Sequence, residues 1–110
     1  RHTSFRNVTG VQTCAFRSGE DMLVENVDFS IIDDIFQVND KESFLMARRL
    51  TREEGLFAGG SSGAAVKISV DLAKKVGKDK IIVTILPDSG TRYLSKIYSD
   101  QWMKDNGFLD

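Results

Sequence analysis

The stretch AGGSSGAAVKISVDLAKKVG at residues 58–77, followed by KIIVTILPDSG at residues 80–90, decides the fold class. Four apolar residues of the first stretch are spaced as on one face of an α-helix: Ala65, Ile68, Leu72 and Val76. Gly77 supplies a helix stop. The KIIVTIL segment is an almost unbroken β-branched run, typical of a parallel strand covered on both faces. A helix followed by such a strand predicts an α/β fold.

Another helix is expected upstream, between Asn39 and Gly55. Asn39 is a good N-cap, and Glu42 three residues later can complete a capping box. Gly55 suits the left-handed position that ends many helices. The segment between them predicts an amphipathic helix, with one face formed by Met46, Ala47 and Leu50.

Two further elements flank these. Residues 34–38 (DIFQV) alternate well enough for a short strand before the first helix. Residues 92–108 are expected to be helical in two pieces, with Ser99 or Asp100 as the cap of the second. The expected order is strand, helix, helix, strand, turn, helix.

Charge and residue usage exclude several classes of site. The chain has 110 residues, with 15 basic and 16 acidic side chains. Three of the basic ones and no acid fall in residues 1–18, so residues 19–110 carry 12 basic and 16 acidic side chains, a balance of −4. This argues against a nucleic-acid surface. His2 and Cys14 also fall in residues 1–18, so the remainder has no imidazole or thiol for a catalytic triad, a disulfide or a zinc site.

Residues 1–18 lack both helical and strand periodicity. Their second part, VTGVQTCAFRS, resembles a translated sequencing adapter, which predicts an artefactual or disordered tail; an ordinary flexible tail is the alternative. Residues 19–110 are then the domain proper. The apolar run that a secretory signal needs is absent, no segment reaches membrane-spanning length, and we expect a cytoplasmic protein.

Two loops are candidate sites. In residues 59–63 (GGSSG), glycines permit close backbone approach and Ser61 or Ser62 can cap the next helix, which is suited to binding an anion. A tight turn packed under a neighbouring strand explains the same residues. Residues 87–90 (PDSG) follow the apolar strand, where open α/β sheets bind ligands. A plain strand-to-helix turn capped by Asp88 or Ser89 is again the alternative.

Several blocks in order carry a family resemblance: GED, MARRL, REEG, GGSSGAA, ILPDSG, RYLSKIYSD, QWM and NGF. From residue 19 onward the chain resembles the C-terminal part of the catalytic domain in the cysteine synthase and cystathionine β-synthase family of fold-type-II pyridoxal-phosphate enzymes. The PDSG turn, followed by RYLSK and DQWM, favours the bacterial cystathionine β-synthase branch over the O-acetylserine sulfhydrylases, which usually have a Pro-Ser type turn there.

This resemblance implies a fold and a cofactor. The chain would be a fragment of a tryptophan synthase β-like, three-layer open sheet with helices on both faces, and it would bind pyridoxal 5′-phosphate. The family's Schiff-base lysine and phosphate loop lie upstream, and neither has a matching motif here. No catalytic residue and no metal ligand are therefore expected in this chain, and the isolated fragment should be inactive.

The resemblance also assigns individual residues. Ser89 corresponds to the hydroxyl that hydrogen-bonds the pyridine nitrogen of the cofactor, where a neutral partner makes the ring a weaker electron sink than a carboxylate would. Asp88, one position earlier, is not that partner. Gly19 matches the second glycine of a bend that borders the cofactor. The Gly-rich loop is expected to shape the floor of the site and to cap its helix through Ser62.

The function implied is β-replacement, condensing serine or an activated serine with homocysteine or sulfide. An O-acetylserine sulfhydrylase-type cysteine synthase is the alternative within the family. Outside it, a non-catalytic α/β module that binds a phosphorylated ligand and a purely structural piece stay open. The expected partners are small amino-acid and thiol substrates, with no nucleic acid or membrane, and the full-length protein is expected to be a homodimer.

Overall fold

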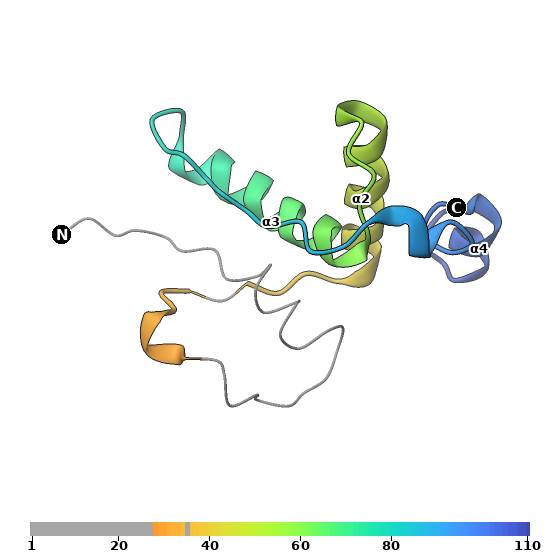
Figure 1. Cartoon of the computed structure of the whole chain (residues 1–110), viewed down its shortest axis with the longest axis horizontal. Helices are drawn as coiled ribbons and strands as arrows, with labels where there is room; N and C mark the ends of the chain where they lie inside the picture. Colours follow the sequence, from red (N-terminus) through yellow and green to blue (C-terminus); the bar gives the residue numbers. More distant parts are fainter. Residues whose placement is uncertain (1–27, 35) are drawn as a thin grey trace.

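The fold is known from a computed structural model, which describes residues 28–34 and 36–110. Its elements are the 3₁₀ helix η1 (Phe29–Ile31), the helices α2 (Asp40–Glu54) and α3 (Gly60–Val76), the 3₁₀ helix η2 (Gly90–Tyr93) and the helix α4 (Asp100–Asp105). Helix α2 lies between α3 on one side and α4 on the other (Figure 1). The described part of the chain is therefore built around two long helices.

Helix α2 begins and ends where the sequence predicts. The side chain of Asn39 accepts a hydrogen bond from the Glu42 N–H at 2.9 Å, and the Glu42 carboxylate accepts one from the Asn39 N–H, so the capping box is complete. Gly55 closes the helix in the left-handed conformation, with φ of 70°, and its N–H donates to the Thr51 carbonyl. Ala47 and Leu50 are buried as expected.

Helices α2 and α3 pack on each other through small residues. A Cβ built at Gly63 would lie 2.0 Å from the Ser43 carbonyl oxygen and 2.9 Å from the Ala47 Cβ. The two backbones thus approach closely, which only a residue without a side chain permits at position 63. On α3, Ala65, Ile68 and Leu72 are buried, in agreement with the predicted apolar face.

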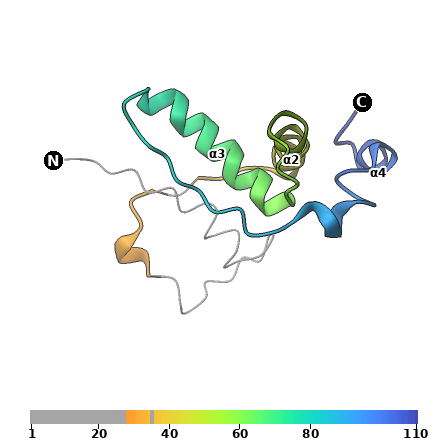
Figure 2. The same cartoon turned by 45° about the horizontal axis from the view of Figure 1, so that its top comes forward.

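The predicted strands do not form over the described residues. Residues 36–38 and 80–86 have no regular structure, and the second of these segments runs back along α3 (Figures 1 and 2). Ile81, Val83 and Ile85 expose 93%, 82% and 61% of their surface. Because a β-strand needs neighbouring strands to pair with, and none lies beside this segment within the described chain, its apolar side chains have nothing to cover them. The covered parallel strand and the three-layer sheet stay predictions.

The C-terminal part is helical in two pieces, as predicted, although the first is only the single turn η2. Ser99 caps α4 by accepting from the Trp102 N–H at 3.3 Å. An aromatic group joins α4 to α2: Phe44 packs against Trp102 and, edge to face, against Phe108 with ring centroids 5.0 Å apart. These contacts hold the C-terminal segment on the side of α2 opposite to α3 (Figure 2).

Candidate functional site

The turn at residues 87–90 is fixed to the segment that leads into α3. Ala58 and Ser89 form an antiparallel β-bridge. On one side of it the Gly59 N–H donates to the Asp88 carbonyl at 3.2 Å, and on the other the Gly90 N–H donates to the Phe57 carbonyl at 3.1 Å. Two backbone hydrogen bonds therefore flank Ser89 and set its place relative to the Gly-rich loop.

Aromatic side chains support this bridge. The ring of Phe57 lies against Gly90, where an added Cβ would be 2.4 Å from a ring carbon, and it also packs on Tyr98 with centroids 4.8 Å apart. The Tyr98 hydroxyl lies 2.5 Å from the Ala58 carbonyl oxygen and 2.8 Å from the Thr51 hydroxyl. Since a carbonyl can only accept, the phenol donates to Ala58. The C-terminal segment thus packs against residues 57 and 58 and fixes their position.

A cavity of about 350 Å³ opens at this bridge. Its walls come from the two bridged segments and are mainly apolar: Leu56, Phe57, Ala58, Leu86, Pro87, Asp88 and Ser89. Lysine and arginine are absent from that lining. The cavity therefore offers apolar contact, the Ser89 hydroxyl and the Asp88 carboxylate, and it offers no cation for a phosphate.

Ser89 is exposed at this cavity, and its hydroxyl accepts hydrogen bonds from the Thr91 N–H and the Thr91 hydroxyl, each at 3.3 Å. These bonds make Ser89 the N-cap of η2, as expected for the alternative in which residues 87–90 form a strand-to-helix turn. Both use lone pairs of the Ser89 oxygen. With the Thr91 hydroxyl as the donor of this pair, the proton of Ser89 is left for an acceptor in the cavity.

The contacts of Asp88 differ from the expectation that Ser62 caps α3. Its carboxylate accepts from the Ser62 hydroxyl at 2.8 Å and from the Ser62 N–H at 3.3 Å. The residue at the N-cap position of α3 is Gly59, which has no side chain to accept, so the prediction that Ser62 caps this helix is wrong. Ser62 lies inside the first turn, fully buried, and is a donor there. The acceptor comes from residue 88 because Gly59 cannot supply one.

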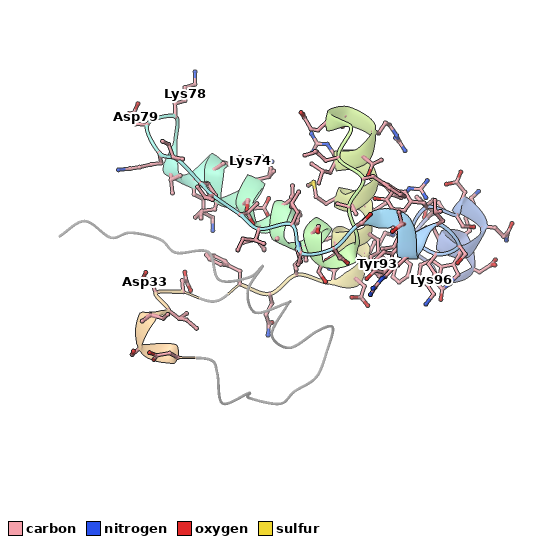
Figure 3. All side chains as sticks on the ribbon, in the orientation of Figure 1. Asp33, Lys74, Lys78, Asp79, Tyr93 and Lys96 are labelled. Carbon is pink, nitrogen blue, oxygen red and sulfur yellow. The ribbon has the colours of Figure 1, made fainter. Side chains whose placement is uncertain are left out.

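The ionisable groups with shifted pKa values lie on the outer surface. The hydrogen bond from Arg49 lowers the pKa of Glu53 on α2, and the hydrogen bond to Asp71 raises the pKa of Lys67 on α3. Figure 3 shows Lys74, Lys78 and Asp79 at the C-terminal end of α3 and Tyr93 at η2.

Residues 28–34 and 36–110 contain no group of three or more potential metal-binding His, Cys, Asp or Glu side chains. In the same ranges no helix combines the length and apolarity needed to cross a bilayer.

Comparison with known proteins assigns the family. Residues 2–88 match the family described as "Pyridoxal-phosphate dependent enzyme". The chain belongs to this family. It is 42% identical over 92 residues to cystathionine β-synthase of Dictyostelium discoideum, covering 84% of this chain and 18% of that protein. It is 46% identical over 72 residues to N-(2-amino-2-carboxyethyl)-L-glutamate synthase of Ralstonia nicotianae, covering 66% of this chain and 21% of that protein.

Solved structures agree with this membership. An O-ureido-L-serine synthase superposes with a TM-score of 0.69 at 32% identity, over 78% of this chain and 30% of that one. The predicted family resemblance and its cofactor, pyridoxal phosphate, are confirmed at the level of the family. The chain spans less than a fifth of the length of the cystathionine β-synthases it matches. It thus corresponds to a small part of such proteins.

Two parts of the prediction lie outside the described residues. Gly19 is one, and its place beside the cofactor stays a prediction. The other is residues 1–18, interpreted as a tail; the family match begins at residue 2 and so takes in most of them. The division of the chain at residue 19 likewise stays a prediction.

The residues at the cavity fit one end of the family's cofactor. A flat heteroaromatic ring can lie against Phe57, Leu86 and Pro87, with the Ser89 hydroxyl available to its nitrogen. A phosphate has no cationic partner among these residues, and the cavity has no lysine to hold the aldehyde. The fit is therefore to the nitrogen edge of the ring.

Sequence analysis singled out Ser89, which lines the cavity, but did not indicate the contacts that Asp88 and Phe57 make. The sequence did carry a signal that α3 needs an outside acceptor, though not which residue supplies it: the helix start at residues 59–60 is Gly-Gly, which leaves the N-cap without a side-chain acceptor. Phe57 carried no comparable signal, since it is one of a short apolar pair beside a loop. Its position over Gly90 follows from the tertiary contact alone.

Proposed function

We propose that this chain is part of a pyridoxal-phosphate-dependent β-replacement synthase, cystathionine β-synthase-like, which condenses serine or an activated serine with homocysteine or sulfide. The names of two relatives support the reaction class, because one carries a 2-amino-2-carboxyethyl group and the other a serine. The 42% identity to cystathionine β-synthases favours a sulfur nucleophile. The cysteine synthase type is the second candidate in the same family.

The observation that carries the proposal is the Ser89 hydroxyl at the cavity. It accepts from the Thr91 N–H and hydroxyl, which leaves its proton available to an acceptor in the space beside Phe57. When bound, the cofactor supplies the electron sink for chemistry at the amino-acid substrate. Ser89 donates to the ring nitrogen without transferring its proton, since an alcohol is too weak an acid for that. Leu56, Phe57 and Leu86 offer apolar surface to the ring face.

A set of variants of Ser89 in the full-length protein tests this role. Ser89→Ala removes one hydrogen bond, which is worth about 1 kcal/mol, and should weaken pyridoxal phosphate binding roughly fivefold. The value of kcat/KM should fall further if the hydrogen bond strengthens as charge develops on the ring. Ser89→Thr keeps the hydroxyl and should retain most binding. Ser95→Ala, at an exposed serine in the next turn, is the matched control.

Unchanged cofactor binding in Ser89→Ala would contradict this role. If Ser89→Ala binds pyridoxal phosphate with the affinity and absorption spectrum of the unsubstituted protein, the hydroxyl does not face the ring. Product analysis with homocysteine, and then with sulfide, separates the two candidate functions. A protein that uses neither thiol with serine or an activated serine would not be a β-replacement synthase of this type.

The proposal includes the wider fold. Residues 80–86 are proposed to be a strand of a parallel, three-layer sheet in the full-length protein, where neighbouring strands cover Ile81 and Val83. Ile81 and Val83 are 93% and 82% exposed in this chain, which supports the proposal that neighbouring strands cover them in the full-length protein. Amide exchange at residues 80–86 should be slow in the full-length protein; exchange as fast there as in the 110-residue chain would contradict the strand. A homodimer in the cytoplasm, without nucleic-acid or membrane partners, completes the proposal.

A further inference from the structure

Asp88 links the candidate site to the start of α3. Its carboxylate accepts from both the hydroxyl and the N–H of Ser62, and its backbone carbonyl accepts from the Gly59 N–H at 3.2 Å. The Ser62 hydroxyl also lies 3.2 Å from that carbonyl and 3.4 Å from the Asp88 N–H. One residue of the turn therefore contacts the first turn of the helix through both its side chain and its backbone.

Helix α3 depends on this contact because its own sequence lacks a cap. Gly59 stands at the N-cap position and makes no side-chain hydrogen bond, whereas α2 and α4 each have a local cap, at Asn39 and Ser99. The first four N–H groups of a helix need acceptors, and a carboxylate there also faces the positive end of the helix dipole. Asp88 meets both needs from outside the helix.

The fit between Asp88 and Gly59 leaves little freedom of position. A Cβ at residue 59 would lie 2.1 Å from the Asp88 carboxylate and 2.6 Å from the ring of Tyr93. The carboxylate is thus enclosed between the start of α3 and the 3₁₀ helix η2. A glycine at the N-cap is what permits this approach, at the expense of a local cap.

The next residue along the chain is Ser89, whose hydroxyl lines the cavity. We propose that Asp88 is a positioning residue that acts through Ser89: by capping α3, its acceptor oxygen fixes the turn, and with it the place of the Ser89 hydroxyl. This inference rests on the proposed function of Ser89. The Oδ1 of Asp88 accepts from the buried Ser62 and its Oδ2 lies toward Gly59, so in this proposal the carboxylate acts on the turn and the start of α3.

Four variants of the full-length protein, with pyridoxal phosphate as the probe, test the proposal. Asp88→Ala removes the acceptor, and Asp88→Asn keeps an acceptor oxygen in its place. Asn39→Ala is the matched control: it removes the N-cap of α2, whose first turns pack against α3 at Gly60 and Gly63, but the Asn39 side chain bonds to Glu42 and its loss leaves Asp88 and Ser62 in place. Ser89→Ala reports the loss of the hydroxyl itself. Amide exchange without cofactor, and the absorption spectrum and affinity of bound cofactor, are measured for each.

We expect Asp88→Ala to speed exchange at the Ser62 and Gly90 N–H groups at least tenfold. It should also weaken cofactor binding severalfold and shift the absorption of the bound cofactor in the same direction as Ser89→Ala. Asp88→Asn should restore the spectrum and most of the affinity. Asn39→Ala should lower stability with the spectrum unchanged.

The contrary outcomes separate the two proposals. A normal spectrum in Asp88→Ala beside an altered one in Ser89→Ala overturns the positioning role and leaves the function of Ser89 intact. A normal spectrum in Ser89→Ala overturns the proposed function instead. If Asn39→Ala shifts the spectrum as Asp88→Ala does, or Asp88→Asn fails to restore it, capping by Asp88 is not the cause. Should Asp88→Ala not fold, Ser62→Ala, which removes one donor to the carboxylate, must give a partial shift, and an unchanged spectrum there refutes the inference.

Discussion

Substituting Gly63 by Ala should destabilise the protein, although the same change at an exposed helical position usually stabilises it by roughly 0.5–1 kcal/mol. The added methyl would lie 2.0 Å from the Ser43 carbonyl oxygen and 2.9 Å from the Ala47 Cβ. A comfortable carbon–oxygen contact is about 3.3 Å. The obstacle is backbone, so α2 and α3 must separate by on the order of 1 Å, and overpacking of this kind costs roughly 1–3 kcal/mol. We expect a net loss of about 2 kcal/mol.

Gly60→Ala is the matched comparison for this prediction, three residues earlier in α3. Its Cβ would lie 3.0 Å from the end of the Phe44 ring and 3.3 Å from the Ile97 Cδ1, both side-chain atoms that can shift. The free energy of unfolding is measured by urea denaturation followed by far-UV circular dichroism. The loss at Gly63 should exceed the change at Gly60 by more than about 1 kcal/mol, on the overpacking range above. Equal values, or a more stable Gly63→Ala, would refute the close approach of the two helices.

Three further substitutions test the support of the site and the cap of α2. Gly90→Ala places a Cβ 2.4 Å from a ring carbon of Phe57; the displaced ring should lower stability by about 1–2 kcal/mol in urea denaturation, and an unchanged midpoint would show that the ring moves freely. Tyr98→Phe removes the donor to the Ala58 carbonyl, and thermal unfolding should show a loss of about 1 kcal/mol, which an unaltered Tm would exclude. Asn39→Ala removes the cap of α2 and should lower the stability of the helix start by about 1 kcal/mol. Amide exchange in the first turn of α2 measures this loss, and protection equal to that of the unsubstituted protein would argue against the capping box.

The sequence was sufficient wherever the physical cause is local. Helix α2 is the clearest case, because Asn39, Glu42 and Gly55 determine its ends through contacts within a few residues. The caps of α4 and η2, at Ser99 and Ser89, are equally local and were among the predicted alternatives. The turn at residues 87–90 could also be singled out from its place after an apolar run, since that position is typical of ligand sites in α/β folds, whereas Ser89 within it was assigned by the family resemblance.

Prediction failed where the partner is remote in the chain. The pattern of residues 80–86 indicates a segment that needs cover on both faces, but pairing depends on strands that the described residues do not supply. The sequence analysis assigned the cap of α3 to Ser62 because serine is a common cap. In the structure Ser62 is a donor, and the acceptor for the start of α3 is Asp88, 26 positions later. A local scan cannot identify such a partner, because nothing within the helix's own sequence encodes it.

The late position of Asp88 bears on the order in which the protein folds during synthesis. Ser62 leaves the ribosome 26 residues before Asp88, which at about 5–20 residues per second corresponds to roughly 1 to 5 s. Throughout that interval the nascent α3 has Gly-Gly at its start and only water as the acceptor for its first N–H groups, so its first turn lacks its cap while the rest of the helix forms. The capped first turn of α3 and the turn bearing Ser89 are therefore completed together, and the cavity lined by residues 56–58 and 86–89 exists only once both of these segments have emerged.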